Sequence, residues 1–134
     1  MKRRNFLIIA ATAIAAGLIG LTGAKAQQTI KIGAVAPKSG PLAAGAAITH
    51  WPNIKLWVTQ VNERGGLKLK NGKAKIELIE YDDRTNPGEA IKNIQRLATQ
   101  DKVDFILAPY GTGFNLATAP IFNKHGYPLI THTA

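Results

Sequence analysis

The chain has 134 residues, with 17 basic and 8 acidic side chains, three histidines and no cysteine. Without cysteine the fold depends on its core alone, and neither a disulfide framework nor a lipid on an amino-terminal cysteine is available. Part of the net charge of +9 belongs to the first 26 residues. The basic residues that remain alternate with acidic or apolar ones and form no dense patch with aromatics, which excludes a typical nucleic-acid-binding surface.

Residues 1–26 have the form of a secretory signal peptide. A basic start precedes an uncharged run over residues 6–21, and the small residues Ala24 and Ala26 stand two apart, as at an A-x-A cleavage site. The uncharged run is shorter than the roughly 20 residues of a membrane-spanning helix. We therefore expect cleavage before Gln27, export to the periplasm and no stable membrane insertion. The pair Arg3-Arg4 fits the twin-arginine route and the general secretory route equally.

The first half of the remaining chain predicts a strand, a loop and a helix. Thr29 to Val35 is short, apolar and rich in β-branched residues, and a loop with prolines and glycine follows it. Residues 43–48 can form a helical turn. Pro52 has no N–H to donate, so it marks a new helix start or a kink, and Gly65-Gly66 ends that helix. The apolar positions at i, i+3, i+4 and i+7 of this helix are Ile54, Trp57, Val58 and Val61.

The middle of the chain predicts a turn, two strands and a helix between them. Residues 68–72 have turn composition, and residues 74–81 form the second apolar run. Asn86 can cap the following helix, Pro87 fits its first position, and Glu89 can reach back to the cap. Residues 103–108 are nearly all apolar, as in a parallel strand covered on both faces. The expected buried stripe of the helix is Ile91, Ile94, Leu97 and Ala98.

After residue 109 the pattern repeats. A glycine-containing turn leads to a helix expected from about Asn115 to Lys124, which Pro120 should kink or confine, and residues 128–130 predict a fourth strand. The order β-α-β-α-β-α-β predicts an α/β fold, a Rossmann-like parallel sheet with flanking helices. Because the last predicted strand should be internal, we expect residues 27–134 to form an incomplete domain.

Ligands of open parallel sheets gather beyond the carboxyl ends of the strands. The segment after the third strand is the most informative of these ends. Gly111 and Gly113 place flexible backbone at a helix start, where unpaired N–H groups and the helix dipole attract an anion. Thr112 adds a hydroxyl, and Tyr110 adds a flat apolar surface with a polar tip. The group suits a carboxylate on a small solute, although a simple glycine turn accounts for these residues equally well.

Other chemistries find less support. Leu116 stands where a dinucleotide-binding motif needs its third glycine, and Ser39 lacks the setting of a nucleophile elbow. His50, His125 and His132 are far apart in sequence without metal-ligand spacing, so we expect surface or loop positions. The sequence therefore predicts no metal and no other cofactor.

Two adjacent aspartates follow the second predicted strand. Asp82 and Asp83 could form a metal site or an acid–base pair, but we expect them to hydrogen-bond the turn after that strand, as aspartates often do. An exported Rossmann-like enzyme that uses one of them, or a histidine, stays open as an alternative function.

Several short motifs occur in an order and spacing that is specific as a set. They are Ile32-Gly33, Ser39-Gly40-Pro41-Leu42-Ala43, Val61-Asn62-Glu63-Arg64-Gly65-Gly66, Tyr81-Asp82-Asp83, Pro109-Tyr110-Gly111-Thr112, Ala119-Pro120-Ile121 and Pro128-Leu129-Ile130. In this arrangement residues 27–134 resemble the amino-terminal lobe of periplasmic receptors for leucine, isoleucine, valine and related solutes.

The resemblance implies a type I periplasmic-binding fold, whose two lobes close on a solute and dock on the membrane permease of an ABC importer. It implies a non-catalytic protein, with a ligand-sensing ectodomain of a signalling receptor as a further alternative. Thr112 matches the hydroxyl residue that holds the ligand carboxylate, and the segment 131–133 matches the next binding loop. Residues 43–46 are small where the family often has a bulky residue, which leaves room for a larger solute. The expected ligand-binding residues are Tyr110, Gly111, Thr112, Gly113, Thr131 and Thr133.

Overall fold

The structure is a computed structural model that describes residues 28–133. The predicted signal peptide, residues 1–26, and the expected mature start at Gln27 lie outside the described residues, as does Ala134. Within the described range, no helix has the length and apolar character needed to cross a membrane.

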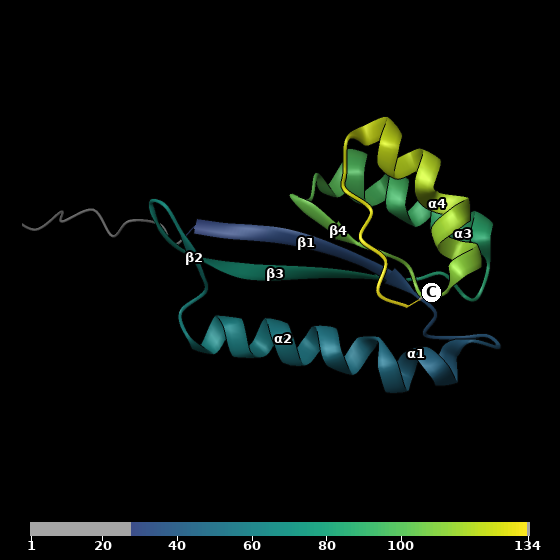
Figure 1. Cartoon of the computed structure of the whole chain (residues 1–134), viewed down its shortest axis with the longest axis horizontal. Coiled ribbons are helices and arrows are strands. Elements are labelled where there is room, and N and C mark those ends of the chain that lie inside the picture. The colour runs from purple at the N-terminus through teal and green to yellow at the C-terminus, as the bar shows by residue number, and fades with distance from the viewer. Residues whose placement is uncertain (1–27, 134) are drawn as a thin grey trace, which may run out of the picture.

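Four strands form one sheet between two layers of helices (Figure 1). The sheet order is β2-β3-β1-β4, so β1 is central and runs parallel to both β3 and β4. Helices α1 and α2 cover one face, and α3 and α4 cover the other. The predicted α/β class with a Rossmann-like parallel arrangement is confirmed. The elements in chain order are β1 (Gln28–Ala36), α1 (Ala43–Thr49), α2 (Trp51–Glu63), β2 (Leu67–Leu69), β3 (Gly72–Asp82), α3 (Pro87–Arg96), the π-helical turn η1 (Leu97–Asp101), β4 (Phe105–Leu107) and α4 (Thr112–His125).

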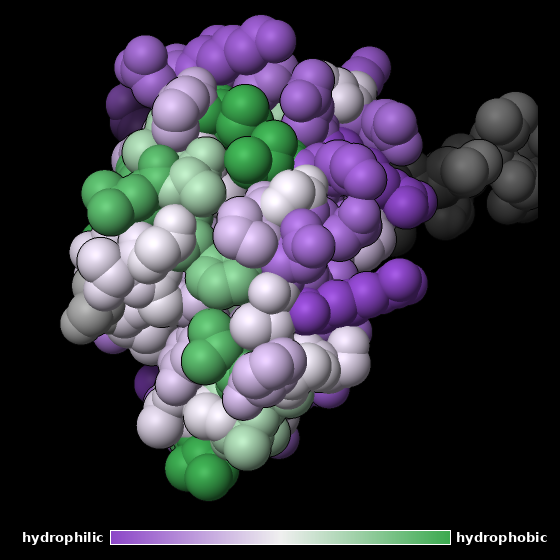
Figure 2. Space-filling model, turned by 90° about the vertical axis from the view of Figure 1, so that its right-hand side faces the viewer, coloured by the Kyte–Doolittle hydropathy of each residue, from purple (hydrophilic) through white to green (hydrophobic). Residues whose placement is uncertain are grey.

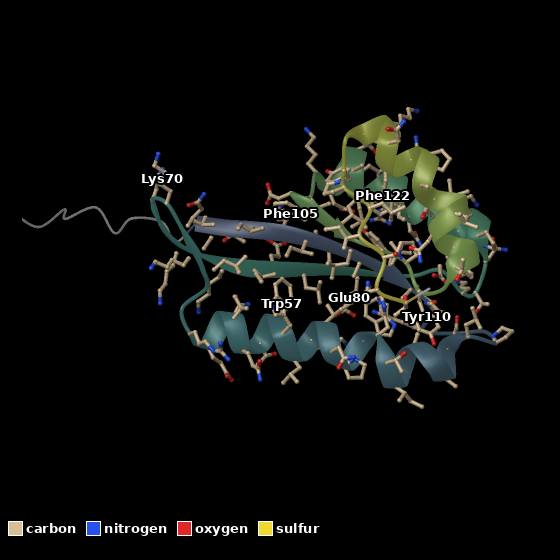
Figure 3. All side chains as sticks on the ribbon, in the orientation of Figure 1. Trp57, Lys70, Glu80, Phe105, Tyr110 and Phe122 are labelled. Atoms are coloured by element: carbon tan, nitrogen blue, oxygen red, sulfur yellow. The ribbon has the colours of Figure 1, made fainter. Side chains whose placement is uncertain are left out.

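The central strand β1 supplies side chains to a core on each face of the sheet. Because successive side chains of a strand point to opposite faces, Val35 belongs to the larger core, under α3 and α4, whereas Ala34 and Ala36 belong to the smaller one, under α1 and α2. Phe122 of α4 fills the larger core and is 1% exposed (Figure 3). The small alanines let α1 and α2 approach the other face closely, with Trp51 as their largest buried side chain.

The start of α3 follows the sequence prediction except for one contact. Asn86 Oδ1 accepts a hydrogen bond from the backbone N–H of Glu89 at 3.1 Å, and Pro87 occupies the first turn. The Glu89 carboxylate accepts from Lys92 Nζ at 2.8 Å instead of reaching back to the cap. The charged ammonium of Lys92, three residues further on, is a stronger hydrogen-bond donor to this carboxylate than the neutral backbone amide of the cap would be.

Three other expectations about the elements were wrong in detail. The segment 68–72 is the end of a hairpin, in which β2 pairs antiparallel with β3, rather than a turn alone. Residues 128–130 form no strand; Pro128 has no N–H for a sheet ladder. The last helix begins at Thr112, well before Pro120, which lies inside it.

Trp57 also differs from its expected core position. It is 39% exposed, while Trp51 and Ile54 are the buried residues of α2. In the described part of the chain, the layer of α1 and α2 covers the sheet face incompletely, and Trp57 lines an open cavity with Leu107 of β4. The rest of the expected stripe holds, since Ile54 is buried and Val58 and Val61 are half-buried, and only Trp57 departs from it.

Candidate functional site

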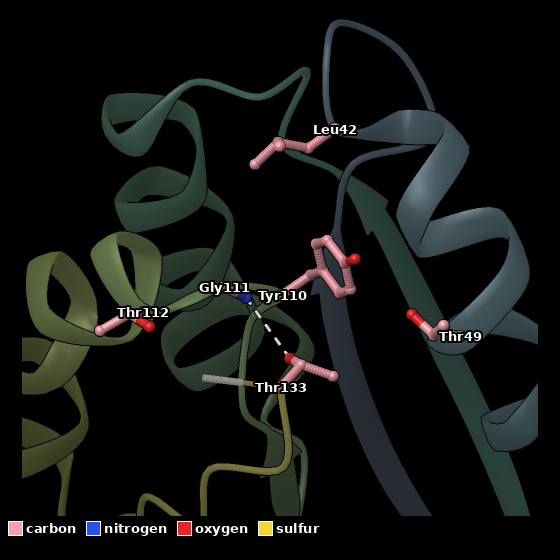
Figure 4. Close-up of a pocket in the computed structure, with 6 residues that line it drawn as sticks. All are labelled: Leu42, Thr49, Tyr110, Gly111, Thr112 and Thr133. Carbon is pink, nitrogen blue, oxygen red and sulfur yellow. Dashed lines mark hydrogen bonds between the residues drawn. The ribbon is translucent and has the colours of Figure 1, made fainter.

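A cavity of about 420 Å³ lies beyond the carboxyl ends of the parallel strands (Figure 4). The β4–α4 loop and the start of α4 form one wall, the α1 region forms another, and the segment after α4 closes it from below. Figure 2 looks onto this end of the molecule, where weakly polar and apolar residues occupy the middle of the surface. None of the six side chains that line the cavity carries a charge. They are Leu42, Thr49, Tyr110, Gly111, Thr112 and Thr133.

Asp82, at the end of β3, holds the loop between β1 and α1 in place. Its Oδ1 accepts hydrogen bonds from the backbone N–H groups of Lys38 and Arg84, both at 2.8 Å, and its Oδ2 accepts from Ser39 Oγ at 2.7 Å. Burial by itself would raise the pKa of Asp82, but these donated hydrogen bonds together keep it below the usual value. The carboxylate is thus committed to structure, and it fixes the loop that carries Leu42.

Asp83 points into the protein and is fully buried. Its Oδ1 accepts from the backbone N–H of Thr85 at 2.8 Å, and its Oδ2 has no hydrogen-bond partner. Burial, together with the negative charge of Asp82, raises the pKa of Asp83 to about 6. The expectation that both aspartates hydrogen-bond the following turn is confirmed, and neither lines the cavity.

The start of α4, beside the cavity, leaves backbone donors unpaired. Gly111, at φ 98° and ψ 148°, precedes the helix in a conformation that other residues rarely adopt. Its N–H is taken by the carbonyl of Thr133 at 2.9 Å. The N–H groups of Thr112 and Gly113 have no acceptor among residues 28–133, and no side chain caps the helix. Two amides and the exposed Thr112 hydroxyl therefore remain for an anion.

Two histidines meet beside the cavity: His132 has the expected exposed loop position, whereas His50 does not. His50, between α1 and α2, is fully buried, and its Nδ1 lies 3.2 Å from Nε2 of His132. Burial, together with the charge of the nearby His132, lowers the pKa of His50 to about 4. Residues far apart in sequence meet here because the segment after α4 returns to the end of the sheet. In the described range no three histidine, cysteine, aspartate or glutamate side chains form a set that could hold a metal ion.

The structure brings four of the six predicted binding residues together. Tyr110, Gly111, Thr112 and Thr133 line the cavity. Gly113 is exposed and lies one residue further into α4, and Thr131 is exposed on the final segment; neither is part of the lining.

Sequence reasoning missed two lining residues. Leu42 belongs to the loop after β1, which the rule for parallel sheets already places at this rim. Thr49 is the last residue of α1, where its Oγ1 donates to the Gly45 carbonyl at 3.0 Å. No local pattern distinguishes Thr49, and only the packing of α1 against the β4–α4 loop brings it to the cavity.

Comparison with known proteins assigns the chain to a family. The model of the family described as periplasmic binding protein matches residues 29–134. The chain belongs to this family. Its solved relatives have the type I periplasmic-binding fold, and the structure of the chain shares it.

Among solved structures, the chain is similar to the branched-chain amino-acid transporter substrate-binding protein LivJ from Streptococcus pneumoniae, in complex with isoleucine. The identity is 34% and the TM-score is 0.72, over 80% of this chain and 29% of that one. A solute-binding protein of an ABC transporter from Rhodopseudomonas palustris, in complex with 3,4-dihydroxybenzoic acid, is 31% identical with a TM-score of 0.62, over 75% and 26% of the two chains. The chain thus spans less than a third of the length of these two relatives.

Proposed function

We propose that this chain is the amino-terminal lobe of the substrate-binding component of an ABC importer, which captures a small carboxylate-bearing solute such as an amino acid in the periplasm. The observation that carries the proposal is the pair of unpaired amides at Thr112 and Gly113, beside a hydroxyl and a cavity, at the ligand-binding end of the sheet. Its partners are then the solute and the membrane permease of the importer.

The relatives support a carboxylate as the common chemical feature of the solute. One relative holds isoleucine and another holds 3,4-dihydroxybenzoic acid, and these ligands share a carboxylate but differ in the rest of the molecule. In this chain the carboxylate would accept from the two amides and from Thr112 Oγ1. None of the described residues that line the cavity is cationic, so the helix dipole and the hydrogen bonds supply the attraction.

A catalytic role fits the geometry less well. Asp82 already accepts hydrogen bonds from the loop between β1 and α1, and Asp83 is buried away from the cavity. A raised pKa in a cleft is a frequent mark of a catalytic acid, but the raised pKa of Asp83 has burial as its cause. We infer that the chain binds its solute without transforming it.

The test is an NMR titration of the ¹⁵N-labelled chain with isoleucine and with benzoate. We expect the amide signals of Thr112 and Gly113 to shift, with weak, millimolar affinity, because closure on a solute draws contacts from both lobes. Thr112→Val should weaken binding about tenfold or more, because one hydrogen bond to a charged group is worth about 1.5 to 3 kcal/mol. Thr59→Val, at an exposed position of α2, is the matched control.

Two results would contradict the proposal. If no carboxylate shifts the amides of Thr112 and Gly113, the start of α4 is not the binding site. If the chain alone binds its solute with micromolar affinity, then one lobe supplies the contacts and the sharing of the site between two lobes is wrong.

A further inference from the structure

The position of Tyr110 in the cavity depends on the absence of a side chain at Gly45. A Cβ atom at Gly45 would lie 2.5 Å from Tyr110 Oη and 3.3 Å from Cζ. Both distances are shorter than an ordinary van der Waals contact. The tip of Tyr110 therefore occupies the space that a side chain at position 45, in the middle of α1, would fill.

A second contact fixes the plane of the Tyr110 ring. The rings of His50 and Tyr110 meet edge to face, with centroids 5.9 Å apart and an interplanar angle of 79°. His50 is itself held between Trp51, at 5.2 Å and 90°, and His132, at 5.0 Å and 21°. Because His50 is fully buried, it gives the half-buried tyrosine a rigid support.

Tyr110 is the one aromatic side chain in the lining of this cavity as described. Its ring stands between Leu42 and Thr133, with the hydroxyl turned toward α1 and Thr49 (Figure 4). The polar groups of the lining are the Tyr110 hydroxyl, the three threonine hydroxyls and backbone groups. Among residues 28–133 no carboxylate side chain lines the cavity, so the described wall has no charged partner for an ammonium group.

We propose that Gly45 and Tyr110 make this site selective for a planar aromatic carboxylate over an aliphatic one. The carboxylate binds at the start of α4, as in the proposed function on which this inference rests, and the flat body of the solute packs along the Tyr110 ring. Aromatic pairs prefer offset-stacked or edge-to-face geometry and are favourable beyond the area they bury. Gly45 acts as a positioning residue, because it touches Tyr110 and not the solute.

The first experiment compares benzoate with cyclohexanecarboxylate by ¹⁵N NMR titration of the full chain. The two acids share a carboxylate on a six-membered ring, but only benzoate is flat and aromatic. Both should shift the amides of Thr112 and Gly113. Benzoate should bind about threefold to tenfold more tightly, which is the range expected for one aromatic contact.

The second experiment tests the role of Gly45 with three variants. Gly45→Ala suits a helix interior, so the chain should stay folded, but Tyr110 must move and the preference for benzoate should fall to about unity. Tyr110→Phe removes the hydroxyl that the new methyl group would strike. In the double variant Gly45→Ala/Tyr110→Phe, the preference for benzoate over cyclohexanecarboxylate should therefore return in large part. Ala44→Ser, at the exposed neighbouring position, should leave the preference unchanged.

The outcomes separate this inference from the function beneath it. If neither acid shifts the amides at the start of α4, the proposed function is wrong and the inference falls with it. If both acids shift those amides with equal affinity, the carboxylate site stands but its selectivity for aromatic solutes is refuted. An undiminished preference in Gly45→Ala would refute the positioning role of Gly45.

Discussion

Two buried titratable groups should oppose each other in the pH dependence of stability. Asp83 and His50 are both fully buried. The pKa of Asp83 is raised from 3.8 to about 6, with burial as the main cause, and the pKa of His50 is lowered from 6.5 to about 4, also mainly by burial. Each difference between the folded and unfolded states corresponds to about 3 kcal/mol of unfolding free energy, because one pKa unit is worth about 1.4 kcal/mol.

The two contributions have opposite signs over the same pH range. Between about pH 4 and pH 6 the unfolded state holds a proton on His50 that the folded state lacks, so this residue makes stability rise with pH. The folded state holds a proton on Asp83 that the unfolded state lacks, so this carboxyl makes stability fall as pH rises through 6. The sum of the two contributions is therefore nearly flat in this interval.

Asp83→Asn isolates one of the two contributions. The amide oxygen of asparagine can still accept from the backbone N–H of Thr85, and the side chain keeps its shape. The unfolding free energy of the variant should exceed that of the parent chain by little at pH 4. Above pH 6.5, where the parent must bury a charge, it should exceed it by up to about 3 kcal/mol. Its own stability should rise by about 1 kcal/mol per pH unit from pH 4 to pH 6.

Urea unfolding at pH 4, 5, 6, 7 and 8, followed by tryptophan fluorescence and circular dichroism, measures these differences. His50→Asn is the mirror variant: apart from a constant loss of packing, its unfolding free energy relative to the parent should improve as the pH falls from 6.5 to 4. A difference between Asp83→Asn and the parent that is constant with pH, or that decreases as pH rises, would refute the assignment of a buried, proton-retaining carboxyl at position 83.

Three further outcomes can be measured with the same methods. Asn86→Ala removes the cap of α3 and should lower the unfolding free energy by about 1 kcal/mol in urea titrations; no loss would contradict its capping role. Phe122→Ala empties the centre of the larger core, where the phenyl ring is 1% exposed, and should cost about 3 to 5 kcal/mol; a cost below 1 kcal/mol would mean that the core collapses around the gap. His132→Phe removes the neighbouring ring charge and should raise the pKa of His50, measured by NMR titration of its ring protons; an unchanged or lower pKa would show that His132 has no electrostatic effect on it.

The features that sequence predicted well are those with local causes. The β-branched run of β1 and the cap and proline of α3 act through residues next to them in the chain, and each is found at its expected place. The end of α4 is of the same kind, because the helix stops at His125, one residue beyond the expected Lys124, where Gly126 adopts a φ of 74°. Rules that concern whole folds also succeeded: the rim of a parallel sheet collects the loops after its strands, and four of the predicted binding residues meet there.

The features that sequence missed depend on contacts between distant segments. His50 and His132 are 82 positions apart, and no local sequence pattern near either residue predicts that their rings stack. Trp57 has the right helical spacing for burial, but burial also requires an element to cover that face. Periodicity predicts which side of a helix is apolar, whereas the extent of its burial is set by neighbours that local sequence does not describe.

The segment after α4 links the histidine pair to the candidate site. It forms no sheet ladder, so its place is set by separate contacts: Tyr127 with the Val103 carbonyl, His132 with His50, and Thr133 with Gly111. The hydrogen bond between the two histidine rings needs one donor nitrogen and one acceptor nitrogen. It can therefore persist while at least one ring is neutral, but not when both rings are protonated. Because His50 takes up a proton only near pH 4, the pair should keep Thr133 at the cavity wall from neutral pH down to about that value. Below it, repulsion between two imidazolium rings acts on the same segment that supplies the wall, so the cavity and the histidine pair should be lost together.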